Sequence, residues 1–149
     1  MKKLSMLGLA IGVCLAAPAM ALEHKVVIEH PEGPIAADYA GTVNVETRQI
    51  GSVGAPGRPS TLRCQWSASL SLERTAQVGE TLKTRREMRR DDVASGSTPG
   101  WCRTNAKAID KLVDARKETF RSAMLELVAQ DRTALLAEAG QGAAAGRDS

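Results

Sequence analysis

The chain has few of the side chains on which catalytic sites depend. Its 149 residues include 3% aromatics, three cysteines and two histidines, His24 and His30, both near the N-terminus. It contains no GxSxG, GxGxxG or P-loop motif, and if Cys64 and Cys102 are paired the mature chain has no free thiol to act as a nucleophile. Three cysteines are also too few for a miniprotein built mainly on disulfides. These absences favour a non-catalytic protein, and a small enzyme of unknown reaction is the alternative.

Long apolar runs are absent too, except at the N-terminus. Lys2 and Lys3 precede an uncharged apolar stretch over residues 4–17, and Pro18 and the small-residue pattern of residues 19–21 follow it. This order is typical of a secretory signal peptide, which we expect to occupy residues 1–21 and to be cleaved after Ala21. The apolar run is shorter than the about 20 residues of a membrane-spanning helix. We therefore expect a bacterial protein that is periplasmic or secreted and is not transmembrane once the signal is removed.

A lipoprotein signal ending at Cys14 is the alternative interpretation of this segment. The residue before a lipidated cysteine is normally small, whereas Val13 is bulky, and cleavage there would leave residues 15–21 as an apolar stub. Cleavage after Ala21 is therefore favoured. The loss of Lys2 and Lys3 then lowers the formal net charge from +3 to +1, which does not support a globally cationic nucleic-acid binder.

Cleavage leaves two cysteines, Cys64 and Cys102, which permit one intramolecular pairing. In an oxidising compartment such a pair predicts a disulfide. The two residues lie 38 positions apart, and the chain-entropy model converts a loop of this length to roughly 4 kcal/mol of stability. A redox or zinc site is the alternative, but no second cysteine lies at the short spacing that either needs.

Alternating apolar residues predict strands in the first two thirds of the mature chain. Residues 25–30 are rich in β-branched side chains, and residues 37–48 alternate between an apolar and a polar face. The clearest pattern is the apolar row formed by Leu62, Cys64, Trp66, Ala68, Leu70 and Leu72. Residues 81–90 suit a short final strand at a sheet edge, and residues 51–60 and 91–100 are interpreted as loops because of their glycine, proline and serine content.

The last third of the chain has the pattern of a helix. Apolar residues recur at spacings of four, seven, four and three, and they are Ile109, Val113, Phe120, Met124 and Leu127. Thr104 or Asn105 is expected to cap the first turn. We expect one helix to extend to Gly140 and residues 140–149 to form a disordered tail.

These elements combine into one α+β domain over residues 22–139. We predict two layers, with an antiparallel sheet of three or four strands packed against a long C-terminal helix. The sheet has one apolar face and the helix one apolar stripe, so each covers the other. The Cys64–Cys102 disulfide would join the longest strand to the start of the helix.

A basic segment is the first candidate binding site. Its five cations are Lys83, Arg85, Arg86, Arg89 and Arg90. They could bind an anionic envelope polymer or lipid headgroups, whereas nucleic acid is disfavoured because no aromatic residue lies among them for base stacking. The alternative is that the segment has no binding role and is a solvated strand edge, partly neutralised by neighbouring acids.

A second candidate site depends on cleavage after Ala21. The mature chain would then begin with Leu22, Glu23 and His24, and its free amine, two deprotonated amides and the imidazole could surround Cu(II) or Ni(II) in a square plane. Any protein cleaved three residues before a histidine has this site by chance. No other cofactor is expected.

The sequence thus favours a small exported domain that binds another protein of the cell envelope. Binding of an anionic polymer or lipid surface through residues 83–90 is the second hypothesis. Neither the partner nor the oligomeric state follows from the sequence, because function depends on sites and not on fold class.

Overall fold

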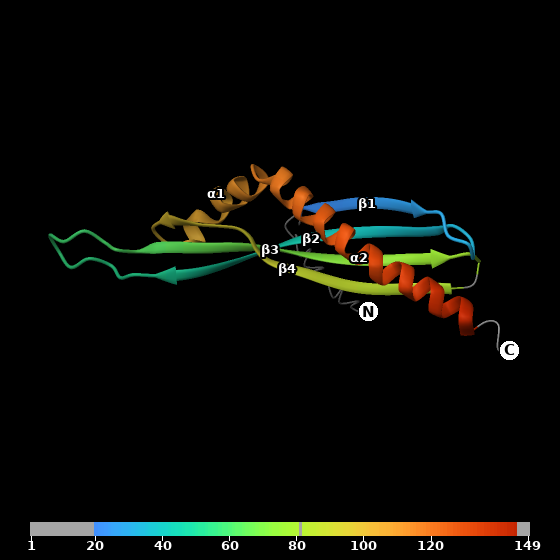
Figure 1. Cartoon of the computed structure of the whole chain (residues 1–149). Coiled ribbons are helices and arrows are strands. Elements are labelled where there is room, and N and C mark those ends of the chain that lie inside the picture. The colour runs from blue at the N-terminus through green and yellow to red at the C-terminus, as the bar shows by residue number, and fades with distance from the viewer. Residues whose placement is uncertain (1–19, 81, 146–149) are drawn as a thin grey trace, which may run out of the picture.

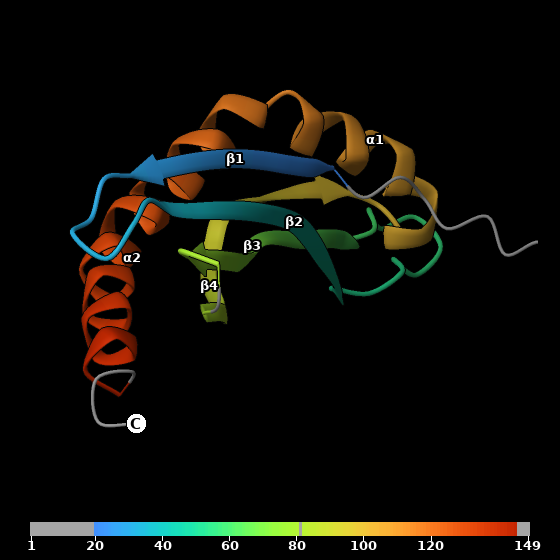
Figure 2. The same cartoon turned by 90° about the vertical axis from the view of Figure 1, so that its right-hand side faces the viewer.

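The computed structural model describes residues 20–80 and 82–145, so that most of the predicted signal peptide lies outside the described residues. Within them the elements are β1 (Ala21–Ile28), β2 (Ile35–Ile50), β3 (Arg63–Val78), β4 (Leu82–Pro99), α1 (Cys102–Asp114) and α2 (Lys117–Ala145). The strands form one antiparallel sheet in the order β1-β2-β3-β4, and both helices cover the same face of it (Figure 1, Figure 2). This arrangement confirms the predicted two-layer α+β fold.

The apolar row predicted from residue 62 onward forms the centre of the core. Cys64, Leu70 and Leu72 on β3 are almost completely buried, and the odd-numbered residues of β3 point to the uncovered face of the sheet. The predicted helical stripe meets this row, because all of its members are buried against the sheet. Period-two and helical patterns therefore identified the two surfaces that pack together.

The last strand is longer than predicted, and the loop predicted over residues 91–100 is wrong. β4 continues to Pro99 and pairs with β3 along its length, apart from an irregularity opposite Ala68 and Leu70. Gly96 lies directly opposite Trp66, where an added Cβ would come within 2.8 Å of the indole ring. The glycine that suggests a loop in the sequence is thus required in a strand, because the indole occupies the space of a side chain.

The helical third of the chain also differs from the prediction. It contains two helices, and the first begins at Cys102 without a side-chain cap from Thr104 or Asn105. Both of these side chains donate hydrogen bonds to the Trp101 carbonyl. The first helical amide is instead bound by a residue of β2, since Gln49 Oε1 accepts a hydrogen bond from the Cys102 amide at 2.8 Å.

The helix α2 extends into the segment predicted to be a disordered tail, so that prediction is wrong for residues 140–145. Gly142 lies where an added Cβ would come within 2.5 Å of Leu82 Cδ2, so that the end of α2 packs closely on the start of β4. Residues 146–149 lie outside the described range. Neither described helix is long and apolar enough to span a bilayer.

Candidate functional site

Within the described residues, the strand β2 has an unpaired edge beside α1. Pairing with β1 covers residues 35–42, and the Val43 amide adds one hydrogen bond to the Met20 carbonyl at 3.4 Å. From there to Ile50, no strand of the described residues pairs with the outer edge of β2. Alternate residues of a strand direct their backbone groups to the same side, so Val45 and Thr47 direct theirs outward, as Val43 does. We call residues 43–49 the β2 edge.

A groove runs between the β2 edge and the flank of α1. Its volume is about 400 Å³, and its lining includes Val45 and Thr47 from β2 and Arg103, Ala106 and Asp110 from α1. Val45 is 38% exposed even though its neighbour Val43 is buried. The groove therefore offers backbone donors and acceptors on one side and a helix flank on the other, which is the surface that strand addition requires.

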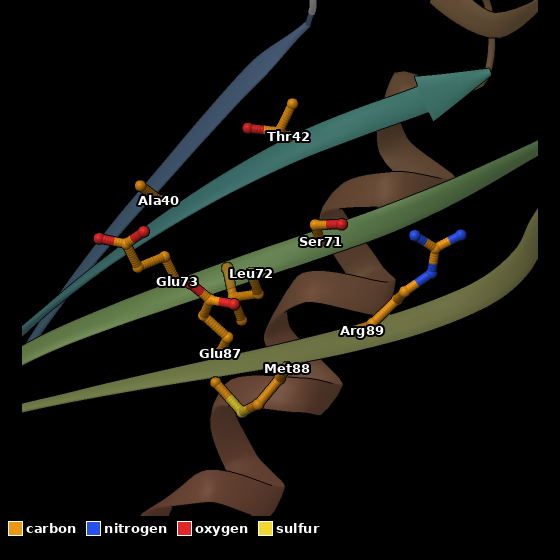
Figure 3. Close-up of a pocket in the computed structure, with 8 residues that line it drawn as sticks. All are labelled: Ala40, Thr42, Ser71, Leu72, Glu73, Glu87, Met88 and Arg89. Carbon is orange, nitrogen blue, oxygen red and sulfur yellow. The ribbon is translucent and has the colours of Figure 1, made fainter.

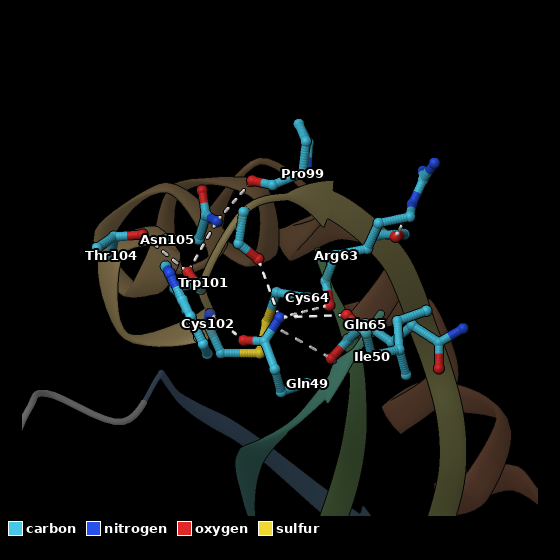
Figure 4. Close-up of a disulfide and its surroundings, with 12 residues drawn as sticks. Gln49, Ile50, Arg63, Cys64, Gln65, Pro99, Trp101, Cys102, Thr104 and Asn105 are labelled. Carbon is cyan, nitrogen blue, oxygen red and sulfur yellow. Dashed lines mark hydrogen bonds between the residues drawn. A yellow bond between two sulfur atoms is a disulfide. The ribbon is translucent and has the colours of Figure 1, made fainter. Parts of the chain in front are cut away.

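The disulfide end of the groove is held in place by several bonds (Figure 4). The Cys64–Cys102 disulfide joins β3 to the first residue of α1, as predicted. Gln49 adds hydrogen bonds from its Nε2 to the carbonyls of Arg63, at 2.9 Å, and Gly100, at 3.1 Å, besides accepting from the Cys102 amide. The helix flank is thus fixed relative to β2 before any partner arrives, which lowers the entropic cost of binding.

The predicted basic segment lies on β4, where strand alternation divides it between two faces. Arg85 and Arg89 point to the uncovered face with Lys83, whereas Arg86 and Arg90 point to the helices. The structure therefore does not gather the five cations into one patch.

The four arginines of this segment pair with carboxylates of β3, β4 and α2. Arg85 pairs with Glu73 at 2.6 Å and Arg89 with Asp91 at 2.6 Å. Arg86 lies 3.5 Å from Asp131, and Arg90 pairs with Glu126. These ion pairs reduce the positive potential of the segment and weaken the case for it as an anion-binding site.

The predicted metal site at Leu22, Glu23 and His24 lies within β1. Leu22 is buried in the core, and all three residues pair with β2. Consecutive amides of a strand point in opposite directions, whereas the square-planar chelate needs the amides of Glu23 and His24 on one side of the metal. Metal binding there would require the first residues of β1 to leave the sheet. Among the described residues, no cluster of three or more histidine, cysteine or acidic side chains could hold a metal ion.

A buried ionic network was missed by the sequence interpretation. Arg74, on β3, is completely buried and donates to Asp131 Oδ2 at 2.9 Å and to Glu138 Oε2 at 2.5 Å, both on α2. The Tyr39 hydroxyl also donates to Asp131 Oδ2, at 3.0 Å. Burial and the negative charge of Asp131 raise the pKa of Tyr39 to about 12. Because neither Arg74 nor Asp131 reaches solvent, we assign this network to the attachment of α2 to the sheet.

The signal for this network was present in the sequence. Arg74 continues the apolar row two residues after Leu72, and Asp131 stands on the helical stripe four residues after Leu127. A charge in phase with an apolar row is a charge placed in the core, and two such charges of opposite sign can pair.

The uncovered face of the sheet is hollowed and polar. A hollow of about 430 Å³ lies over β2, β3 and β4, and its lining includes Thr42, Ser71, Glu73, Glu87 and Arg89 (Figure 3). Its acidic and basic side chains are mixed, and two of its members belong to the Arg85–Glu73 and Arg89–Asp91 pairs. This face therefore presents no single sign of charge to a ligand.

Comparison of the chain with models of protein families, with curated proteins and with solved structures finds no match in any of the three.

Proposed function

We propose that this protein is an exported, non-catalytic binding module that takes an extended segment of a cell-envelope protein as an added strand on the β2 edge. The observation that carries the proposal is the run of outward backbone groups from Val43 to Gln49 beside the groove under α1. A peptide strand placed there would continue the line of β1, and alternate side chains would enter the groove.

The surroundings of the edge are those of a binding site and not those of an edge that is blocked against pairing with other chains. Exposed edges are usually blunted by charge, proline or a covering element, because they pair with other chains without selection. At the β2 edge the inward-facing side chains Val45 and Thr47 are uncharged, and α1 stands beside the edge without covering it. The helix flank would limit which side chains can enter, and so would give specificity.

Two features support the proposal that the protein is exported from the cytosol. A disulfide joins β3 to α1, and such bonds persist mainly outside the cytosol. Residues 1–21 have the pattern of a secretory signal. Together these support function in the periplasm or outside the cell.

Site-specific photo-crosslinking in bacteria that express the full chain tests the proposal. A photoreactive amino acid replaces Ala106 in the groove wall, and a second version carries it at Gln77, which lies on the uncovered face. We expect a covalent protein adduct from position 106 and none from position 77. Adducts from both positions, or from neither, would overturn the proposal.

Two substitutions at one residue then test strand addition itself. Thr47→Pro removes an outward amide that is not bonded to β3, and Thr47→Val keeps the amide and the side-chain volume. The adduct from position 106 should disappear with Thr47→Pro and persist with Thr47→Val, while both variants keep the far-UV circular dichroism of the parent. An adduct that survives the proline would show that the groove binds its partner without backbone pairing.

A further inference from the structure

Five exposed cations gather at the end of the molecule that holds the disulfide. They are Arg48, Arg58, Arg63, Arg103 and Lys107, and we call this region the cationic end. Among the described residues, no carboxylate lies within ion-pair distance of any of them. This contrasts with the predicted basic segment on β4, whose four arginines are all paired.

The sequence explains why these cations remain unpaired. Residues 47–72 and 93–109 contain no aspartate or glutamate at all, and the nearest acids along the chain are Glu46, Glu73, Asp92 and Asp110. The two segments come together in space, because the β2–β3 hairpin, the end of β4 and the start of α1 lie at one end of the sheet (Figure 1). The five positive charges therefore lie mainly among neutral side chains, with Glu46 and Asp110 at the margin of the region, and their fields add.

The register of the sheet brings some of these cations close to one another. Arg48 pairs with Gln65, and Arg63 pairs with Ile50, so that Arg48 and Arg63 are diagonal neighbours on the uncovered face. Arg103 and Lys107 stand one turn apart on α1. Arg58 lies between Arg48 and Arg63 in the chain, in the loop that joins β2 to β3.

Exposed apolar side chains accompany the charges. Val53, in the same loop, is 65% exposed, and Trp101 is 43% exposed with the Arg103 guanidinium 5.8 Å from its ring centroid. Tryptophan beside a cation is suited to the boundary between lipid headgroups and acyl chains, where the ring is buried and the charge meets phosphate. A soluble polyanion would use the charges alone and would leave Val53 and Trp101 in water.

We propose that the cationic end docks on the surface of an anionic phospholipid bilayer, with the cations on lipid phosphates and Trp101 in the interfacial layer. This inference is independent of strand addition at the β2 edge, because it rests on different side chains. Attraction to the bilayer would weaken with rising salt, since exposed charges are screened beyond about 8 Å at physiological ionic strength.

Sedimentation with vesicles of phosphatidylglycerol and phosphatidylcholine tests this proposal, with phosphatidylcholine vesicles as the uncharged reference. One triple variant carries Arg48→Gln, Arg58→Gln and Arg63→Gln, and its matched control carries Lys83→Gln, Arg85→Gln and Arg89→Gln, so that both lose three positive charges. Each surface cation contributes about fivefold to binding, so the first variant should bind about 100-fold more weakly than the parent and the control less than fivefold more weakly. Equal losses in the two variants, or equal binding of the parent to both kinds of vesicle, would overturn the proposal.

Tryptophan fluorescence distinguishes bilayer docking from capture of any soluble polyanion. Trp66 is buried, so a change on binding reports Trp101. With anionic vesicles that contain brominated lipid we expect quenching of Trp101, and with heparin at the same ionic strength we expect none. Vesicle binding without quenching would show that the cationic end binds anions in general, and the bilayer proposal would fail even if crosslinking at the β2 edge succeeds.

Discussion

The two ends of the molecule hold a helix to the same sheet by different chemistry. At one end a disulfide and the hydrogen bonds of Gln49 fix the start of α1, and the surrounding cations have no ionic partner among the residues that the structure describes. At the other end α2 is fixed by Arg74, which lies between Asp131 and Glu138 with no exposed surface. A covalent attachment leaves charges available for a ligand, whereas an ionic attachment uses them inside the fold.

This contrast explains why a count of cations misjudges the surface. The segment over residues 83–90 has the higher density of positive charge in the sequence, but its arginines lie at the end where acids from β3, β4 and α2 are close. The cationic end has fewer cations per residue, and its two segments, residues 47–72 and 93–109, contain no acids. Net potential, rather than local charge density, decides where an anion binds.

The largest expected effect comes from breaking the ionic attachment. Asp131→Asn keeps the shape of the side chain but leaves the buried Arg74 with the partly exposed Glu138 as its counter-charge, in place of a fully buried carboxylate. Loss of one partner from a buried pair costs about 3–5 kcal/mol, and we expect that decrease in the free energy of unfolding measured with urea. The cost would arise from the desolvated guanidinium and not from lost packing.

The control for this prediction is Glu138→Gln. The Glu138 side chain is 31% exposed, so water can replace part of its interaction with Arg74, and the loss should be clearly smaller. If Asp131→Asn cost less than about 1 kcal/mol, α2 would be held by apolar packing alone and the comparison of the two ends would lose its basis.

The next largest effect is expected from removing the covalent attachment. The double substitution Cys64→Ala and Cys102→Ala should lower the free energy of unfolding by about 2–4 kcal/mol, mainly because the unfolded chain gains freedom. Hydrogen exchange should accelerate more for the amides of α1 than for the amides of α2 near Asp131. Equal acceleration in both helices would show that the two ends are one cooperative unit.

Combining Asp131→Asn with the cysteine substitutions tests whether the two attachments are independent. If the attachments are independent, the losses from Asp131→Asn and from the cysteine substitutions should add to within about 0.5 kcal/mol in urea unfolding. A total that is clearly smaller or larger would mean that one attachment positions the other.

Much of the fold followed from the sequence because its patterns reflect backbone geometry. The apolar row from Leu62 to Leu72 permits only a strand with one covered face, and two cysteines permit only one pairing. The second half of β4 could not be predicted, because Gly96 is explained by the Trp66 ring on the neighbouring strand. A residue that owes its identity to a distant partner looks like a loop residue until that partner is placed.

The candidate sites were less predictable than the fold. The β2 edge exists because β1 is shorter than β2, and no residue of β2 itself reports that difference. The core positions of Arg74 and Asp131 were not predicted, because charged residues usually lie at the surface, although both stand on apolar rows. Three of the acids that pair with the basic segment are brought near only by the tertiary structure, and they are Glu73, Glu126 and Asp131.

The smallest of the expected effects is an alkaline loss of stability confined to the ionic end. The pKa of Tyr39 is raised from 10.0 to about 12 in the folded protein, so folding favours the protonated hydroxyl. Its contribution is complete below pH 10 and is lost as the pH rises from about 10 to about 12, which amounts to about 2–3 kcal/mol. Urea unfolding across this range should show that loss in the parent, and Tyr39→Phe should lack it, since lysine titration is common to both.

The cysteine double variant should retain the full alkaline loss, because Tyr39 contacts Asp131 and not the disulfide. If the cysteine variant lost the effect as well, the Tyr39 environment would depend on the covalent attachment, and the two ends could no longer be treated as separate.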